Sequence, residues 1–193
     1  MSQPIILASS SRYRAELLCR LGLEFDTLAP ELDETQRPEE SAKSLVMRLA
    51  AEKAAKVAHL HPHAIVIGSD QVAISNGETL GKPGTAERAA QQLADASGGT
   101  VTFYTAVSVV QLAADKESHF IDQTTVYFRT LSTAEIERYI AADQPLDCAG
   151  SFKVESLGAS LFEKMECADP TALVGLPLIQ LSHALRKFGV QLP

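Results

Sequence analysis

The chain has 193 residues, of which 46% are hydrophobic and 21% charged, the balance of a globular protein with enough apolar surface for a core. Its formal net charge of −7 argues against a protein that coats nucleic acid, because such proteins normally carry a basic excess. No apolar stretch approaches the ~18 residues that a membrane span needs. The three cysteines are widely separated, so they predict neither a zinc knuckle nor a disulfide framework and favour the reducing cytoplasm.

The first elements alternate between strand and helix. Pro4–Ala8 predicts a short buried strand, and the hydroxyls of residues 9–11 can cap a helix that runs to about Leu21. Phe25–Ala29 predicts a second strand, which ends in the acidic loop Pro30–Thr35.

The middle of the chain holds the longest helix pattern and the most apolar strand. Ser41–His59 predicts a helix rich in alanine and lysine, and Ala64–Ile74 predicts a central strand. Asn76-Gly77 marks a turn, and Thr85–Ala96 predicts a further helix.

Strands cluster in the second half. Val101–Gln111 and His119–Arg129 predict two long strands, followed by a helix over Thr133–Ala142, a strand around Ala159–Lys164 and a closing helix to about Phe188. This order predicts an α/β fold with a mixed central sheet and flanking helices. No linker separates two independent domains, so we expect one domain over residues 1–193; a second lobe over about residues 85–150 is left open.

Asp70 is the most informative residue of the chain. It lies inside the apolar run Ile65–Ile74, where a carboxylate is expensive unless a metal, a cation or a proton donor accompanies it. Two interpretations stay open: a metal ligand or general base, or a structural carboxylate that holds a loop.

Three further segments carry groups that could bind a polyphosphate. Ser9–Arg14 joins a strand to a helix, and helix N-terminal amides and arginine both favour phosphate, although simple capping explains the serines equally well. Lys82 supplies a cation in a Gly-Lys-Pro turn, whereas the pattern around Lys53 predicts a solvent-facing lysine. One of the acidic-loop residues Glu31, Asp33 and Glu34 could complete a magnesium site, or the loop is only a solvated turn.

Eight segments, spread in order over essentially the whole chain, carry a family resemblance. They are Ile6–Leu18, Pro30–Glu34, Leu49–Ala54, Gly68–Gln71, Gly81–Pro83, Phe103–Ala106, Cys148–Lys153 and Asp169–Pro177. Together they resemble the Maf nucleotide pyrophosphatases, and most of all the branch that hydrolyses 7-methyl-GTP.

The resemblance implies a fold similar to the inosine-triphosphate pyrophosphatases, with two lobes around a cleft. The implied reaction cleaves a nucleoside triphosphate between the α and β phosphates, with a divalent cation such as Mg²⁺, Mn²⁺ or Co²⁺. The implied role is house-cleaning, the removal of modified nucleotides from the pool. A homodimer is left open, and neither nucleic acid nor membrane is expected as a partner.

The resemblance also assigns roles to individual residues. Asp70 is implied as the proton acceptor and as a metal ligand, and Glu31 matches the acidic position near the metal. The implied phosphate contacts are Ser9, Arg14, Lys53 and Lys82.

Base choice is implied at Tyr13, Gln71 and Glu155, where the thymidine and uridine branch usually has arginine, threonine and glutamine. A 7-methylguanine ring is cationic, so Tyr13 could stack on it with a cation–π component. Glu155 presents only acceptors and could take both the N1–H and the exocyclic amine of guanine. The alternatives are the same chemistry on dTTP or UTP, and a nucleotide-binding regulator of septum formation with little turnover.

Overall fold

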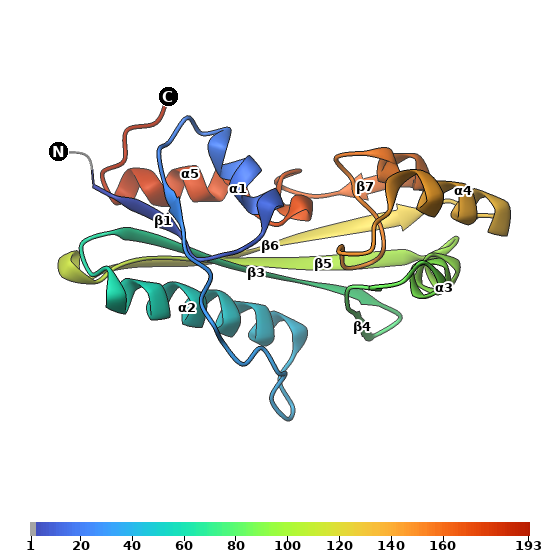
Figure 1. Cartoon of the computed structure of the whole chain (residues 1–193), viewed down its shortest axis with the longest axis horizontal. Coiled ribbons are helices and arrows are strands. Elements are labelled where there is room, and N and C mark those ends of the chain that lie inside the picture. Colours follow the sequence, from blue (N-terminus) through green and yellow to red (C-terminus); the bar gives the residue numbers. More distant parts are fainter. Residues whose placement is uncertain (1–2) are drawn as a thin grey trace. The chain divides into compact units, whose positions relative to one another are not determined.

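The computed structural model describes residues 3–193, and these form two compact units (Figure 1). The first unit takes in the chain up to Gln71, together with Tyr104–Asp122 and Asp169–Pro193. The second unit consists of Val72–Phe103 and Gln123–Ala168. Three long strands supply residues to both units: β3 (Ile65–Ser75), β5 (Thr100–Gln111) and β6 (Lys116–Phe128).

The strands of the described chain form one seven-stranded sheet in the order β2-β1-β3-β5-β6-β7, with β4 paired to β3. The strand β1 lies parallel to both neighbours, so that Ile6 is opposite Asp26 and Val66. The strand β4 pairs with β3 in the antiparallel sense. The sheet is therefore mixed, and the predicted α/β class is confirmed. The remaining strands are β1 (Ile5–Leu7), β2 (Asp26–Thr27), β4 (Glu78–Leu80) and β7 (Phe162–Glu166).

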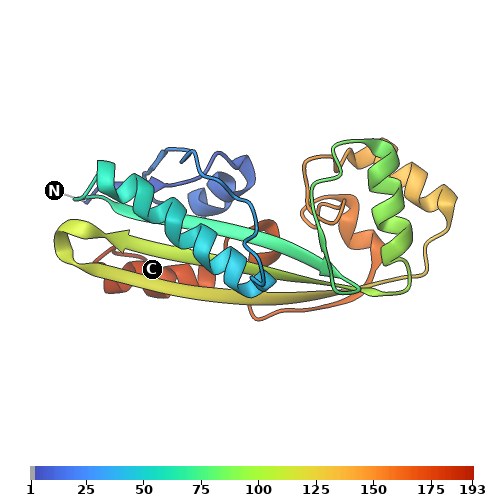
Figure 2. The same cartoon turned by 90° about the horizontal axis from the view of Figure 1, so that it is seen from below.

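The core of the first unit lies on both faces of its strands. Since side chains alternate along a strand, Leu7 and Ile67 pack into a core with α1 and α5, whereas Ile6 and Val66 pack with residues of α2. Figures 1 and 2 show α2 on one face of β3, and Figure 1 shows α1 and α5 on the other. The helices of this unit are α1 (Arg12–Cys19), α2 (Ala42–Leu60) and α5 (Leu178–Lys187).

The second unit has an aromatic core of its own. Four phenylalanine rings meet edge to face with centroids 4.8–5.6 Å apart, a geometry that adds to their burial. They are Phe103, Phe128, Phe152 and Phe162. The helices of this unit are α3 (Ala86–Ala96) and α4 (Thr133–Asp143), and α4 begins with a capping box between Ser132 and Glu135.

Two local predictions differ from the structure. The expected strand around Ala159–Lys164 is a 3₁₀ helix, η2 (Leu157–Leu161), followed by β7, because Ser160 Oγ and the Gly158 amide donate to nearby carbonyls and close a tight turn. The strand β4 was not predicted; Asn76 and Gly77 both have positive φ and form the hairpin turn that leads into it. None of the helices in residues 3–193 is long and apolar enough to cross a bilayer.

Candidate active site

The site begins with the close approach of α2 to β3 at Gly68. A Cβ atom on Gly68 would lie 2.3 Å from the Ala50 carbonyl oxygen and 2.7 Å from the Ala54 amide nitrogen. Only glycine fits there, because it has no side chain to hold the two backbones apart. The helix therefore lies directly against the strand, two residues before Asp70.

This approach brings Lys53 of α2 onto Asp70 of β3. The Nζ atom of Lys53 lies 2.6 Å from Oδ1 of Asp70, and the two residues are only 7% and 9% exposed. The prediction of a solvent-facing Lys53 is wrong, because Lys53 shares the buried face of α2 with Leu49 and Val57. Leu49 lies four residues before Lys53 and Val57 four residues after it. This spacing places the three side chains on one helix face, so the sequence could have indicated that Lys53 is buried.

A second carboxylate reaches the same ammonium group. Oε1 of Glu34 lies 2.8 Å from Lys53 Nζ, although the Glu34 side chain is 57% exposed. Of the acidic residues weighed for this loop, the structure therefore places Glu34 at the Lys53–Asp70 pair. The Glu31 side chain is exposed, and its backbone carbonyl accepts a hydrogen bond from Lys56.

The loop that carries Glu34 is fastened to α2 by Arg48. The guanidinium donates to both carboxylate oxygens of Glu40, at 2.7 and 2.8 Å, and to the Thr35 carbonyl at 3.1 Å. Hydrogen bonds from Arg48 and from the Arg37 amide hold the pKa of Glu40 at about 2. Because such a fork fixes both partners in one geometry, the loop is held beside the site.

Ser9 and Arg14 meet at the start of α1. Ser11 is the N-cap residue, and its hydroxyl accepts from the Arg14 amide. The buried Ser9 hydroxyl accepts from the Ser11 amide at 3.1 Å and from Arg14 Nη1 at 3.4 Å. The predicted pair of phosphate ligands is thus already in contact, and both lie in the first unit with Lys53 and Asp70.

The loop Asp169–Pro177 lies against these residues. The Gly175 carbonyl accepts from Arg14 Nε at 3.0 Å and from Ser69 Oγ at 2.9 Å. A Cβ on Gly175, which has φ of +121°, would lie 3.3 Å from Arg14 Nε. The sequence analysis assigned no role to Ser69 or Gly175. Gly175 lies 161 residues from Arg14 in the chain, so no local sequence pattern could predict their contact.

Gln71 holds the same loop from the other side. Its amide nitrogen donates to the carbonyls of Ala172 at 2.9 Å and Leu173 at 3.1 Å, and lies 2.8 Å from Thr105 Oγ1. Since the Thr105 hydroxyl donates its own hydrogen to Ala172, it accepts from Gln71, and this network fixes which end of the amide is nitrogen. The amide oxygen of Gln71 is the end that can serve a ligand.

The charges of the cluster act on one another. Burial raises the pKa of Asp70, and nearby Lys53 and Arg14 oppose that rise. Burial lowers the pKa of Arg14, and Asp70 and Glu34 oppose that change. Two cations and two carboxylates therefore share one partly buried region, where an added anion would find cations that water screens only weakly.

The other predicted residues lie in three places. The Tyr13 hydroxyl accepts from Arg12 at 2.8 Å, and the Arg12 guanidinium stands 4.8 Å from the Tyr13 ring centroid, so this ring already carries a cation. Lys82 and Glu155 are exposed and belong to the second unit, whereas the other seven predicted site residues belong to the first.

Within residues 3–193, no three His, Cys, Asp or Glu side chains gather as a metal-binding group.

Comparisons with known proteins agree over nearly the whole chain. A family model described as "Maf-like protein" matches residues 4–188. The chain is 57% identical over 189 residues to a protein of Xanthomonas axonopodis pv. citri named 7-methyl-GTP pyrophosphatase, with 98% of each chain covered. It is 52% identical over 189 residues to a protein of the same name from Pseudomonas aeruginosa, again with 98% of each covered.

A solved structure shows the same fold. The structure of a HAM1 protein from Coxiella burnetii matches with a TM-score of 0.52 and covers 96% of this chain and 100% of its own, at 14% sequence identity. A likeness at this identity concerns the fold alone.

Proposed function

Because this chain belongs to the Maf family, we propose that it is a nucleoside triphosphate pyrophosphatase that hydrolyses 7-methyl-GTP to 7-methyl-GMP and diphosphate. The substrate assignment rests on sequence identities of 57% and 52%, over nearly the full length, to relatives named 7-methyl-GTP pyrophosphatase. The buried Lys53–Asp70 pair beside Arg14 supports the chemistry. We further propose that the whole chain works as one Maf-like domain.

Asp70 is the proposed proton acceptor. A water molecule attacks the α–β phosphoanhydride, its proton passes to an Asp70 oxygen, and the bond to the diphosphate group breaks. Lys53 favours the ionised carboxylate that this role needs, while burial raises the pKa toward neutrality. Arg14, Lys53 and Lys82 are the proposed cations for the phosphates, and Ser9 a further contact; cations in a water-poor site stabilise negative charge as it develops on the leaving group.

We propose that a divalent cation binds with the nucleotide. Two carboxylates, Asp70 and Glu34, converge on one cationic group in this structure, and Mg²⁺ commonly takes one or two carboxylates together with substrate phosphates. Asp70 and Glu34 therefore fit such an ion, and Glu31 is the second candidate on the same loop. When bound, the ion would neutralise phosphate charge.

Base recognition is proposed for Tyr13, Gln71 and Glu155. The Tyr13 ring lies against the Arg12 guanidinium, and this cation–π contact supports the proposal that the ring can stack on the cationic 7-methylguanine. The acceptor-only Glu155 matches the two donors of a guanine edge, whereas uracil and thymine offer only one. These residues favour 7-methyl-GTP over dTTP or UTP as the substrate.

The position of cleavage and the fact of turnover are tested by product analysis. With 7-methyl-GTP and Mg²⁺, Mn²⁺ or Co²⁺, we expect equal amounts of 7-methyl-GMP and diphosphate by ion-exchange chromatography. Release of 7-methyl-GDP and orthophosphate would refute cleavage between the α and β phosphates. Tight binding without products would instead favour a nucleotide-binding regulator of septum formation.

The setting of the enzyme is also a proposal. Three widely separated cysteines fit the reducing cytoplasm, where we expect a house-cleaning role on modified nucleotides. A homodimer stays a prediction, which light scattering at several protein concentrations would test.

A further inference from the structure

Asp143, at the end of α4, is a buried carboxylate to which no role has been assigned so far. It is 9% exposed, and its Oδ1 accepts a hydrogen bond of 2.6 Å from Ser156 Oγ. Its Oδ2 has no hydrogen-bond partner among residues 3–193. A buried carboxylate with an unpaired oxygen destabilises a fold, so its presence here points to a use.

That use is visible in the segment that carries Glu155. The Lys153 amide donates to the Tyr139 hydroxyl at 3.0 Å, and Lys153 Nζ donates to the Asp143 carbonyl at 2.7 Å. Lys153 lies two residues before Glu155, and Ser156 lies one residue after it. Both sides of Glu155 are therefore bound to the last turns of α4.

Tyr139 and Asp143 of α4, together with Lys153 and Ser156 on either side of Glu155, form a group that we call the clamp. Tyr139 lies one helical turn before Asp143 on α4. Burial, together with the nearby Asp143 carboxylate, raises the pKa of Tyr139, so its hydroxyl stays protonated. The Tyr139 oxygen accepts from the Lys153 amide and Asp143 Oδ1 accepts from the Ser156 hydroxyl, so the two residues hold the chain on either side of Glu155.

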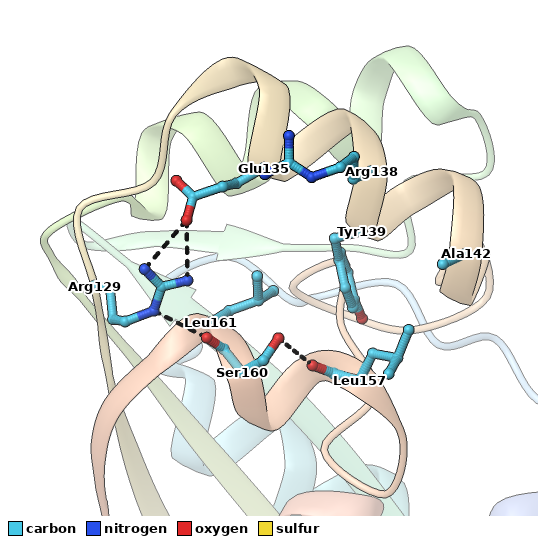
Figure 3. Close-up of a pocket in the computed structure, with 8 residues that line it drawn as sticks. All are labelled: Arg129, Glu135, Arg138, Tyr139, Ala142, Leu157, Ser160 and Leu161. Atoms are coloured by element: carbon cyan, nitrogen blue, oxygen red, sulfur yellow. Dashed lines mark hydrogen bonds and ion pairs between the residues drawn. The ribbon is translucent and has the colours of Figure 1, made fainter.

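The chain after Glu155 is equally fixed. The Gly158 amide donates to the Lys153 carbonyl at 2.9 Å, and a Cβ on Gly158 would lie 2.4 Å from that oxygen. Arg129 donates to the Ser160 carbonyl at 2.9 Å and pairs with Glu135 at 3.3 Å. Figure 3 shows the bonds of Arg129 to Ser160 and Glu135, which lie at a pocket of about 300 Å³, with the Tyr139 side chain pointing from α4 toward the segment around Leu157.

We propose that Asp143 and Tyr139 are positioning residues for base recognition, which hold Lys153 and Ser156 so that the exposed Glu155 carboxylate is presented in one orientation. The inference rests on the proposed role of Glu155. A side chain held in its binding orientation before the ligand arrives loses less entropy on binding. Because the clamp acts through Glu155, we expect it to affect the choice of base and not the cleavage step.

Ser156→Ala is the sharpest single test, because it removes one hydroxyl from an exposed residue and leaves the buried carboxylate in place. We expect kcat/KM for 7-methyl-GTP to fall about threefold to tenfold, the range for freeing one or two side chains, through a rise in KM. The kcat for 7-methyl-GTP and the kcat/KM for UTP should stay near the wild-type values. Ser160→Ala is the matched control, since among residues 3–193 the Ser160 hydroxyl bonds only to the Leu157 carbonyl of the same segment.

Asp143 itself is tested by a conservative pair of variants. Asp143→Asn keeps an oxygen for Ser156 and should retain most of the preference for 7-methyl-GTP over UTP, whereas Asp143→Ala should lose it. Circular dichroism and the unfolding midpoint identify variants that fail to fold. If Asp143→Ala does not fold, Ser156→Ala alone decides the question.

A double-mutant cycle with Glu155→Gln separates the inference from the proposed function. Glu155→Gln should lower the preference by itself, and Ser156→Ala should then have no further effect on it, because the two changes act through one carboxylate. If Glu155→Gln lowers the preference and Ser156→Ala does not, the positioning role is overturned and the proposed function stands. Equal effects of Ser156→Ala in both backgrounds would also overturn it. No effect of Glu155→Gln would overturn the base-reading assignment and the positioning role together.

Discussion

At the scale of single residues, the contact between Lys53 and Asp70 determines how the site works. Both groups are buried, and removing one partner of such a pair typically costs ~3–5 kcal/mol, because the other charge is left uncompensated. Here Lys53 also touches Glu34, so it keeps a partner when Asp70 is neutralised. The site is therefore suited to substitutions that change chemistry without unfolding the chain.

The first prediction concerns the proton acceptor. Asp70→Asn keeps the size of the side chain and removes its basicity, so kcat should fall by ~10² to 10⁴ while the circular dichroism spectrum is unchanged. Asp26→Asn is the matched control, because Asp26 is exposed in β2. A variant with more than about a tenth of the wild-type kcat would contradict the assignment.

The second prediction concerns pH. Burial raises the pKa of Asp70, and a base works only when ionised, so the acidic limb of kcat/KM should lie above the ~3.9 of a free aspartate. Activity is gained as pH rises through that raised value. Lys53 lowers this pKa, so Lys53→Met should move the Asp70 titration to higher pH.

Carbon-13 NMR of the Asp70 carboxyl, in wild type and in Lys53→Met, measures that shift without relying on turnover. Lys56→Met is the control, since Lys56 is exposed on the same helix and donates to the Glu31 carbonyl. A titration that stays in place or moves to lower pH in Lys53→Met would contradict the electrostatic account.

At the scale of elements, the sequence predicted what local patterns encode. The apolar run at Ala64–Ile74 and the alanine-rich stretch at Ser41–His59 correspond to β3 and α2 within one residue at each end. The hairpin strand β4 has only three residues, too few to show an alternation. The turn at Gly158 depends on a contact with the Lys153 backbone, and the periodicity of the sequence does not predict such a contact.

In the candidate site, too, local patterns identified some residues, whereas contacts between distant segments became visible only in the folded chain. Asp70 stood out because a carboxylate interrupts an apolar strand. The lysine-rich pattern of α2 predicted a solvent-facing Lys53, and only its four-residue spacing from Leu49 and Val57 distinguishes it from the other two lysines of the helix. The contacts of Gly175 with Arg14 and Ser69 join segments more than 100 residues apart, so only the folded chain shows them.

The third prediction tests the packing of α2 on β3. Gly68→Ala places a methyl group against the Ala50 carbonyl oxygen, so the helix must move, and overpacking of this kind costs ~1–3 kcal/mol of unfolding free energy. Urea denaturation should show a lower midpoint. Activity should fall as well, because Lys53 moves with the helix.

Gly81→Ala is the control for that change. A Cβ at Gly81 meets nothing within 4 Å in the described structure, so its unfolding midpoint should match that of the wild type. Equal midpoints for Gly68→Ala and wild type would show that the helix and strand are not in tight contact.

At the scale of the whole molecule, fold and function rest on different observations. A HAM1 protein shares the fold at 14% identity, which shows that this architecture tolerates almost complete replacement of its sequence. Function must therefore be argued from residues. A chain of net charge −7 binds an anionic nucleotide only through a local group of cations, and Arg14 and Lys53 supply one within the first unit.

Selection of 7-methyl-GTP by the enzyme is measured by competition between substrates in one reaction. Equal concentrations of 7-methyl-GTP, GTP, UTP and dTTP are mixed with the wild-type protein and a divalent cation, and the four monophosphates are quantified at early times. Because competing substrates are consumed in proportion to kcat/KM, we expect 7-methyl-GMP to accumulate fastest, and Asp70→Asn to form none of the four at a comparable rate. Faster formation of UMP or dTMP would show that the enzyme does not select 7-methyl-GTP.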